Sequence, residues 1–343
     1  MDETTGVKAP GKILLVGGYS ILKQGNISYV VSIDKYVHAC AQKKSSGDAN
    51  RNPAVELKSF GATGEYDTDL FGPKTPEFKF ANRAIWTFYS IYRDFERDVI
   101  LETWNDSAFG APAGKTGLGS SAASVVAMVG ALFRHHFGAL DVNTIHAISQ
   151  YVHYTVQEAG SGFDVASACF GSIKYSRFGP GSFKGRAPDK VVGVELDCTI
   201  EPLPFPADYG MLYIPLGKSV SSAERIAKIN VGEKNLDALN EANIKCIESL
   251  YSPKEFFREM RTGRDILEGM AKEAGFALLE PQDRQLLEKL DREGLAVSPG
   301  AGGESLVFLA ADEGSCDKAK EIINESGLKY IQLGEAIGLR YVV

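Results

Sequence analysis

Several features common in other protein classes are scarce in this chain of 343 residues. The five cysteines are scattered without a CxxC pair, so neither a disulfide framework nor a zinc site is indicated, and the thiols suit a reducing compartment. The five histidines form no ligand cluster. No apolar run reaches the roughly 18 residues that a membrane span needs. The opening MDETTGVKAPGK lacks the basic and apolar regions of a signal peptide, so we expect a cytoplasmic protein.

Positive charge is also in deficit, with 37 Lys and Arg against 44 Asp and Glu and a net charge of −7. A field of that sign argues against nucleic acid as the main partner, although a local cationic pocket can still bind a small anionic substrate. Glycine, with 36 residues, is raised. Because glycine costs backbone entropy in regular elements, the surplus predicts tight turns and a backbone that comes close to a ligand.

The hydrophobic pattern mixes strand-like and helix-like segments without a strict βαβ order, which favours an α+β fold over a doubly wound sheet. The length suits two domains, and the glycine- and charge-rich stretch 179–190 marks the looser end of the first. We therefore predict an N-terminal domain over 1–190 and a C-terminal domain over 191–343. The main predicted strands are 7–16, 28–42, 171–178, 191–200 and 209–216, and the main predicted helices are 79–97, 120–137, 141–158, 220–230, 233–250, 253–275, 282–293 and 315–326.

The sharpest motif is KTGLGSSAA, from Lys115 to Ala123. Gly117 and Gly119 allow the backbone to bend close to a ligand, and the apolar helix that follows points its free N–H groups and positive dipole end into the bend. Such an arrangement binds phosphate. The two hydroxyls of the first helical turn could add hydrogen bonds and hold Mg²⁺.

Three other interpretations of this motif are possible. A Walker A loop needs a glycine five residues before Gly114, where the sequence has Phe109, so the spacing is wrong. A dinucleotide-binding fingerprint would use Gly117, Gly119 and Ala122, but no clear βαβ unit surrounds them. The third is a glycine-rich turn that only caps an apolar helix.

Two further segments decide between these interpretations. KAPGKILLVGGYSIL lies near the N-terminus and SPGAGGESLVFLA near the C-terminus. Together with KTGLGSSAA, and in this order, they resemble the three signature motifs of the GHMP kinases, a superfamily of small-molecule kinases. The resemblance covers roughly residues 7–43, 110–180, 209–230 and 295–312. It implies a two-domain GHMP kinase fold, in which a ribosomal S5 domain 2-like N-terminal domain packs on a ferredoxin-like C-terminal domain with the active site between them.

Finer details resemble one branch of this superfamily. Gly-Gly-Tyr at 17–19 replaces the Gly-Glu-His usual in mevalonate and galactose kinases, and KTGLGSSA, GSGFDVA, GSIKYSRF and PGAGG all look like eukaryotic-type phosphomevalonate kinases. The resemblance implies ATP-dependent phosphorylation of a phosphomevalonate in isoprenoid synthesis, with Mg²⁺ as cofactor. Mevalonate 5-phosphate is the expected acceptor. A kinase acting on a hydroxyl of another mevalonate species, such as mevalonate 3-phosphate at its 5-position, and a non-catalytic small-molecule sensor of the same fold stay open.

The resemblance also implies roles for individual residues. Lys12 and Asp164 match the catalytic pair, and a buried Asp164 would need a partner, for which Lys12 is the candidate. Ser121, with Ser120 as the alternative, and Glu158, with Gln157 as the alternative, are the expected Mg²⁺ ligands. Glu304 or Ser305 replaces the aspartate that usually follows G-A-G-G. The residues expected to bind the ATP phosphates are Lys115, Gly117, Leu118, Gly119, Ser120, Ser121 and Ala122. Those expected to bind the substrate are Tyr19, Ser161, Lys174, Arg177, Lys218, Ser219, Gly302 and Gly303, and Asn82 and Trp86 are candidates for the adenine side.

Overall fold

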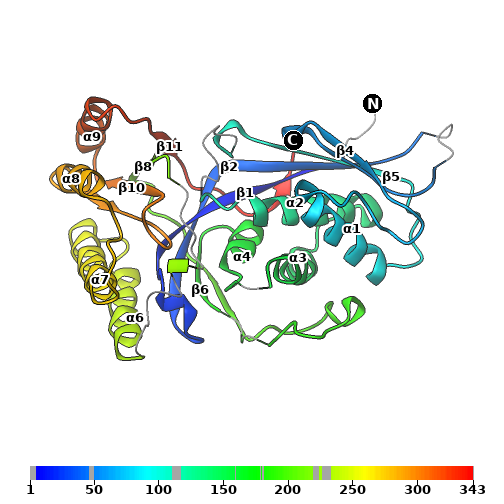
Figure 1. Ribbon diagram of the computed structural model, residues 1–343, viewed down its shortest axis with the longest axis horizontal. Helices are drawn as coiled ribbons and strands as arrows, with labels where there is room; N and C mark the ends of the chain where they lie inside the picture. The colour runs from blue at the N-terminus through cyan, green and yellow to red at the C-terminus, as the bar shows by residue number, and fades with distance from the viewer. Residues whose placement is uncertain are drawn as a thin grey trace.

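A computed structural model describes residues 5–45, 50–109, 117–158, 160–177, 179, 181–218, 224–225 and 233–342. The described chain forms two sheets, one of eight strands and one of four, with helices packed on both (Figure 1). Lys115 and Ser219, two of the predicted site residues, lie outside the described residues. No helix among the described residues is long and apolar enough to cross a membrane.

The larger sheet is built around two long antiparallel strands, β1 (Thr5–Val16) and β2 (Ile27–Lys43). Strand β2 is rich in β-branched and aromatic residues, which favour a pleated, half-buried surface. The strand order is β12-β1-β2-β5-β3-β4, and β6 and β7 extend the sheet from β2. The remaining strands are β3 (Ala54–Leu57), β4 (Ala62–Glu65), β5 (Val99–Asn105), β6 (Ile173–Ser176), β7 (Thr199–Pro202) and β12 (Arg340–Tyr341).

One face of this sheet is covered by α1 (Lys79–Ile91), α2 (Ser120–Phe137), α3 (Val142–Gln157) and α4 (Phe163–Phe170) (Figure 1). Helix α2 is the central one: eleven of its residues are buried in the core between the sheet and the other helices. Glycines with positive φ bound it at both ends, Gly119 at +83° and Gly138 at +73°. Because glycine adopts this conformation without steric cost, the sequence fixes both ends of the helix.

The smaller sheet has the antiparallel order β11-β8-β10-β9, formed by Ile331–Leu333, Gly210–Pro215, Ser305–Ala310 and Leu295–Val297. Helices α8 (Pro281–Leu290) and α9 (Glu313–Glu325) cover one face of it. Helices α6 (Glu233–Glu248) and α7 (Pro253–Glu273) cover the other, in a hydrophobic core that also contains Ile13 and Leu15 of β1. The two sheets therefore share one apolar core. Short 3₁₀ helices occupy Ser20–Leu22, Lys58–Phe60, Pro76–Phe78, Ser107–Phe109 and Pro188–Lys190.

The α+β prediction is confirmed, whereas several predicted bounds differ from the structure. The helix predicted over 79–97 ends at Ile91, and the strand predicted over 191–200 is reduced to β7 at its end. The helix predicted over 220–230 lies largely outside the described residues. The domain boundary between 190 and 191 stays a prediction; the sheets divide the chain differently, because β7 and β12 both belong to the larger sheet.

Candidate active site

The glycine loop before α2 bends at two glycines among the described residues. Gly117 and Gly119 have φ values of +70° and +83°. The backbone N–H of Lys12 donates to the Leu118 carbonyl at 2.8 Å, which fastens the loop to β1. Since Gly119 has no side chain with which to cap α2, the first N–H groups of the helix are left to a partner outside it, and they favour an anion.

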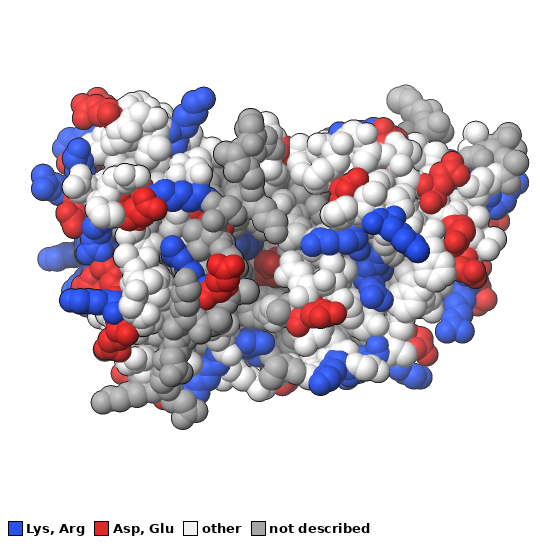
Figure 2. All heavy atoms as spheres, in the orientation of Figure 1, with Lys and Arg blue, Asp and Glu red and all other residues white. Residues whose placement is uncertain are grey.

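A cavity of about 480 Å³ opens beside this helix start. It is lined by Ser120, Ser121 and Ser124 of α2, Phe80 of α1 and Thr103 of β5, among others. The volume falls within the range of roughly 300–1,000 Å³ typical of small-molecule sites. Figure 2 shows Lys and Arg side chains grouped over α1, which carries Lys79 and Arg83. A local surplus of positive charge therefore lies near the cavity despite the net negative charge of the chain.

Lys12 lies against the same loop. Its Nζ donates to the Gly117 carbonyl at 3.0 Å, and its aliphatic stem passes so close to Gly119 that a Cβ there would lie 3.0 Å from Lys12 Cε and Cγ. Burial lowers the pKa of Lys12, while the charges of Asp164 and Glu304 act in the opposite direction. The ammonium group is thus held next to the loop that presents the helix dipole.

Asp164 lies in the first turn of α4 and faces His153 of α3. Asp164 Oδ2 is 3.8 Å from His153 Nε2, and its Oδ1 accepts from the backbone N–H of Val165 at 3.0 Å. The same His153 nitrogen is 3.4 Å from Ser121 Oγ. The structure therefore brings together two of the predicted residues, Ser121 and Asp164, around a histidine that the sequence analysis missed.

The predicted partner of Asp164 was Lys12, and the two form no ion pair within 4 Å in the described residues. Lys12 Nζ donates to a carbonyl instead, although the Asp164 charge raises its pKa. The polar neighbour of Asp164 is His153.

The second glycine loop, from Ser298 to Glu304, is held by side chains from outside it. The Tyr19 hydroxyl donates to the Ala301 carbonyl at 3.0 Å. Arg225 Nη1 donates to the carbonyls of Ala301 and Gly302 at 3.1 and 2.8 Å, and to that of Leu278 at 3.1 Å. Gly302 and Gly303 were predicted here, but Arg225 was not, because nothing in its local sequence indicates contacts with a loop 76 residues away.

Two of the predicted substrate cations already have carboxylate partners. Lys174 pairs with Glu201 across the β6–β7 ladder at 3.1 Å, and Lys218 pairs with Asp283 at 2.6 Å and Glu280 at 2.9 Å. These pairs weaken both lysines as candidates for binding a phosphorylated substrate.

Ser161 lies in the turn before Asp164, and Arg177, directly after β6, contacts the same turn. Arg177 Nη1 donates to the Leu22 carbonyl at 3.0 Å and its Nη2 contacts the Gly160 carbonyl at 3.5 Å. The Ser161 carbonyl accepts from the Tyr175 hydroxyl at 2.6 Å. The side chains of Arg177 and Tyr175 therefore hold the turn that leads into α4.

The two uncertain acidic residues lie in different surroundings. Glu158 forms the C-cap of α3 with φ +56° and is exposed. Glu304 is the last residue of the second glycine loop. Its Oε2 would be 3.2 Å from a Cβ built on Gly117. Of the two, Glu304 is the acidic residue beside the first glycine loop.

The residues near the loop suit Mg²⁺ bound through a nucleotide. The described residues contain no group of three or more His, Cys, Asp or Glu that could hold a metal ion. Mg²⁺ prefers oxygen ligands and usually takes only one or two from the protein, with the rest from phosphates and water. Ser121 Oγ and the Asp164 carboxylate are such oxygens, so the donor set fits.

Asn82 and Trp86, the candidates for the adenine side, both belong to α1. Asn82 is engaged elsewhere, since it accepts from Tyr66 Oη and donates to the Pro73 carbonyl, both at 2.8 Å. The residues of α1 that line the large cavity are Lys79, Phe80 and Ala81.

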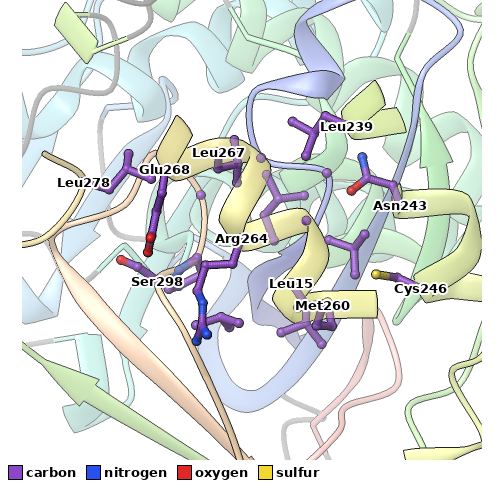
Figure 3. Close-up of a pocket in the computed structure, with 18 of the residues that line it drawn as sticks. Leu15, Leu239, Asn243, Cys246, Met260, Arg264, Leu267, Glu268, Leu278 and Ser298 are labelled. Atoms are coloured by element: carbon purple, nitrogen blue, oxygen red, sulfur yellow. The ribbon is translucent and has the colours of Figure 1, made fainter. Parts of the chain in front are cut away.

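A second cavity lies between β1, α6 and α7, next to Gly17–Gly18 and Ser298–Gly300 (Figure 3). Most of its lining is aliphatic, with Leu15, Leu239 and Met260 pointing inward. Its volume of about 60 Å³ is far below that of a small-molecule site, whereas the cavity beside α2 lies within that range and is the candidate nucleotide site.

The comparisons with known proteins point to one superfamily of kinases. Residues 107–172 match the family described as GHMP kinases N terminal domain. The chain is 30% identical to a phosphomevalonate kinase of Saccharolobus solfataricus over 352 residues, covering 97% of this chain and 98% of the relative. It is 24% identical to a mevalonate kinase of Thermococcus sibiricus, covering 97% and 96%. Among solved structures, Streptococcus pneumoniae phosphomevalonate kinase in complex with phosphomevalonate and AMPPNP has a TM-score of 0.82 at 20% identity, covering 96% of this chain and 99% of that one.

The fold and the family match thus define a phosphotransferase of the GHMP kinase class. The full-length match at 30% identity narrows the assignment. The chain belongs to the phosphomevalonate kinase family.

Proposed function

We propose that this protein transfers the γ-phosphoryl group of ATP to the phosphate of mevalonate 5-phosphate, which yields mevalonate 5-diphosphate and ADP. The observation that carries the proposal is the start of α2, where the uncapped helix, two serine hydroxyls and Lys12 converge beside a cavity of about 480 Å³. This site supplies what phosphoryl transfer demands, namely dipoles and cations around the moving group.

In the proposed reaction, an oxygen of the acceptor phosphate attacks the γ-phosphorus while the bond from that phosphorus to the β,γ-bridging oxygen breaks. Protonated Lys12 and the N–H groups at the start of α2 stabilise the negative charge on the transferring group. Bound Mg²⁺ would neutralise charge on the nucleotide phosphates, and Ser121 with Asp164 would hold it. Because the second pKa of a phosphate monoester lies near 6, the acceptor is already mostly ionised at neutral pH. Asp164 then orients the site and need not remove a proton.

The second glycine loop is the proposed acceptor side. Arg225 and Tyr19 donate hydrogen bonds to its backbone carbonyls, so the shape of the loop is fixed before substrate binds. Arg225 also brings a permanent positive charge to this side of the site. We therefore assign recognition of the phosphorylated acceptor to the region of Tyr19, Arg225 and the loop.

The test is a panel of acceptors with ATP and Mg²⁺, read by phosphorus NMR. Mevalonate 5-phosphate should give the coupled resonances of a diphosphate. Turnover restricted to mevalonate or to mevalonate 3-phosphate, with a new monoester signal, would overturn the choice of a phosphate acceptor. Binding of ATP without turnover of any acceptor would favour the sensor interpretation.

A further inference from the structure

Helix α3 carries a stripe of four polar residues on one face. His146, Gln150, His153 and Gln157 are spaced by four, three and four residues, which places them one above another along the helix. The first three are buried, with exposed fractions of 7%, 1% and 4%. Burying polar side chains is costly unless they are hydrogen-bonded. The three buried side chains of the stripe are therefore expected to have hydrogen-bond partners.

The first pair of the stripe fixes the turn before the catalytic carboxylate. Gln150 Nε2 donates to the Gly162 carbonyl at 2.6 Å and lies 3.1 Å from His146 Nε2. Gly162 is the N-cap residue of α4, with φ +81°, and Asp164 follows two residues later. The pair thus sets the point in space from which Asp164 projects.

The second pair reaches the side chains of the site itself. His153 Nε2 lies 3.1 Å from Gln157 Nε2, 3.4 Å from Ser121 Oγ and 3.8 Å from Asp164 Oδ2. The imidazole ring stacks on Phe80 with ring centroids 5.5 Å apart and an interplanar angle of 10°. One nitrogen, on a ring whose plane is fixed by packing, therefore faces a residue from α2 and a residue from α4.

We propose that His153 is a positioning residue, which holds the Ser121 hydroxyl and the Asp164 carboxylate in register across three helices. The inference rests on the roles proposed above for Ser121 and Asp164. Glu158, which the sequence predicted as a Mg²⁺ ligand, is an exposed C-cap of α3. His153 lies five residues earlier, with its Nε2 3.4 Å from Ser121 Oγ and 3.8 Å from Asp164 Oδ2. Residues that orient metal-binding or catalytic groups commonly matter 10- to 100-fold.

Two substitutions separate the nitrogen from the ring. His153→Phe keeps an aromatic ring to stack on Phe80 but removes Nε2, and His153→Gln keeps a hydrogen-bonding group but removes the ring. We expect kcat to fall about 10- to 100-fold in His153→Phe. The KM values for ATP and for the acceptor should change by less than about threefold, and His153→Gln should recover most of the lost rate.

The matched control is His136→Phe. His136 also lies in an aromatic cluster, stacked on Phe95 with centroids 4.6 Å apart, at the far end of α2 from the glycine loop. We expect this change to affect thermal stability and leave kcat unchanged. Equal losses of kcat and of Tm in His153→Phe and His153→Gln would assign His153 to packing alone and overturn the proposal.

Two measurements do not depend on turnover. The affinity of Mn²⁺ for the complex with ADP, followed by electron paramagnetic resonance, should weaken about tenfold in His153→Phe, with ADP binding in the absence of metal unchanged. In the wild-type protein labelled with ¹⁵N-histidine, the Nε2 resonance of His153 should shift on addition of Mg²⁺ and ADP, and that of His136 should stay in place.

A His153 resonance that does not respond, or wild-type Mn²⁺ affinity in a folded His153→Phe variant, would contradict the positioning role. The NMR experiment needs no variant to fold. If the acceptor panel fails while these two measurements succeed, the proposed substrate is wrong and the role of His153 stands.

Discussion

The two glycine loops of the site use the same residue in different ways. Gly117 and Gly119 lead into helix α2, whereas Gly300, Gly302 and Gly303 lead into strand β10. A helix start offers N–H groups and a positive dipole to an anion. A strand has no such end effect, since the dipoles of neighbouring peptides largely alternate.

The backbone partners of the loops differ accordingly. The carbonyls of Gly117 and Leu118 accept from Lys12, which places a cation on the loop that also presents a helix dipole. The carbonyls of Ala301 and Gly302 accept from Arg225 and Tyr19, which hold the loop in shape. The first loop therefore presents a helix dipole together with the Lys12 cation. The second loop is held in a fixed shape, and the positive charge beside it belongs to Arg225. Four substitutions test this difference.

The largest effect is expected for Lys12→Met, which removes the cation of the first loop. We expect kcat to fall about 10²-fold or more, because a charge aimed at the transferring group is lost. The measurement is steady-state kinetics with both substrates near saturation. A kcat within a few-fold of wild type would contradict the assignment of Lys12.

The same variant has a pH signature in stability. Burial lowers the pKa of Lys12 in the folded state below its ordinary value of 10.5. Between the two pKa values the unfolded chain binds more protons, so wild-type stability rises with pH in that window. The Tm of Lys12→Met minus that of wild type should therefore decrease from pH 7 toward pH 10.5. A difference that stays flat would show that the lysine is not desolvated.

The next largest effect is expected for Gly119→Ala. Alanine is disfavoured at φ +83°, by about 1–2 kcal/mol, and its Cβ would lie 3.0 Å from the Lys12 stem. The change should displace both the helix start and the cation, so we expect kcat to fall at least about tenfold and ATP binding to weaken. Calorimetric titration with ATP and Mg²⁺, alongside kinetics, would check both.

Gly303→Ala should have a smaller and different effect. Its Cβ would lie 2.6 Å from Arg225 Nη2 and 3.0 Å from the Leu278 carbonyl, so Arg225 has to move. We expect KM for the phosphorylated acceptor to rise by about tenfold, worth about 1.4 kcal/mol, with KM for ATP nearly unchanged. A larger effect on ATP than on the acceptor would reverse the assignment of the two loops.

Gly300→Ala is the smallest change and the control for the second loop. Gly300 also has a positive φ, +64°, but a Cβ there would meet nothing within 4 Å. Only the conformational cost of about 1–2 kcal/mol applies. We expect a slightly lower Tm with both KM values unchanged, and a kinetic defect as large as that of Gly303→Ala would show that backbone strain alone explains the latter.

The local part of the site was predictable from the sequence, and the long-range part was not. Gly119 and Gly138 fix the helix start and end through local backbone preferences, so the glycine loop before α2 could be located from the residues themselves. The partners of Lys174 and Lys218 lie 27 and 65 residues away in the chain, and no local pattern reveals them. Lys174 and Lys218 are therefore weaker candidates for substrate binding, because each already pairs with a carboxylate that is distant in the sequence.

Two elements show intermediate cases. The stripe on α3 is visible as a periodic pattern, but a pattern of polar residues does not say what they face, so His153 was missed although its neighbour Asp164 was predicted. A terminal strand near 338–343 is predicted from the sequence and β12 occupies Arg340–Tyr341, but its place beside β1 depends on tertiary contacts.

The position of β12 has a consequence for biosynthesis. Val7 and Lys8 of β1 pair with Tyr341 and Arg340. All strands of the smaller sheet therefore lie between β1 and β12 in the sequence, although β1 and β12 are neighbours in the larger sheet. During synthesis on the ribosome, β12 emerges only after the whole segment from β8 to β11 has been made. Until then Val7 and Lys8 have no strand partner at the outer edge of β1. At synthesis rates of roughly 5–20 residues per second this is a delay of many seconds, during which an unpaired strand edge is open to other nascent chains.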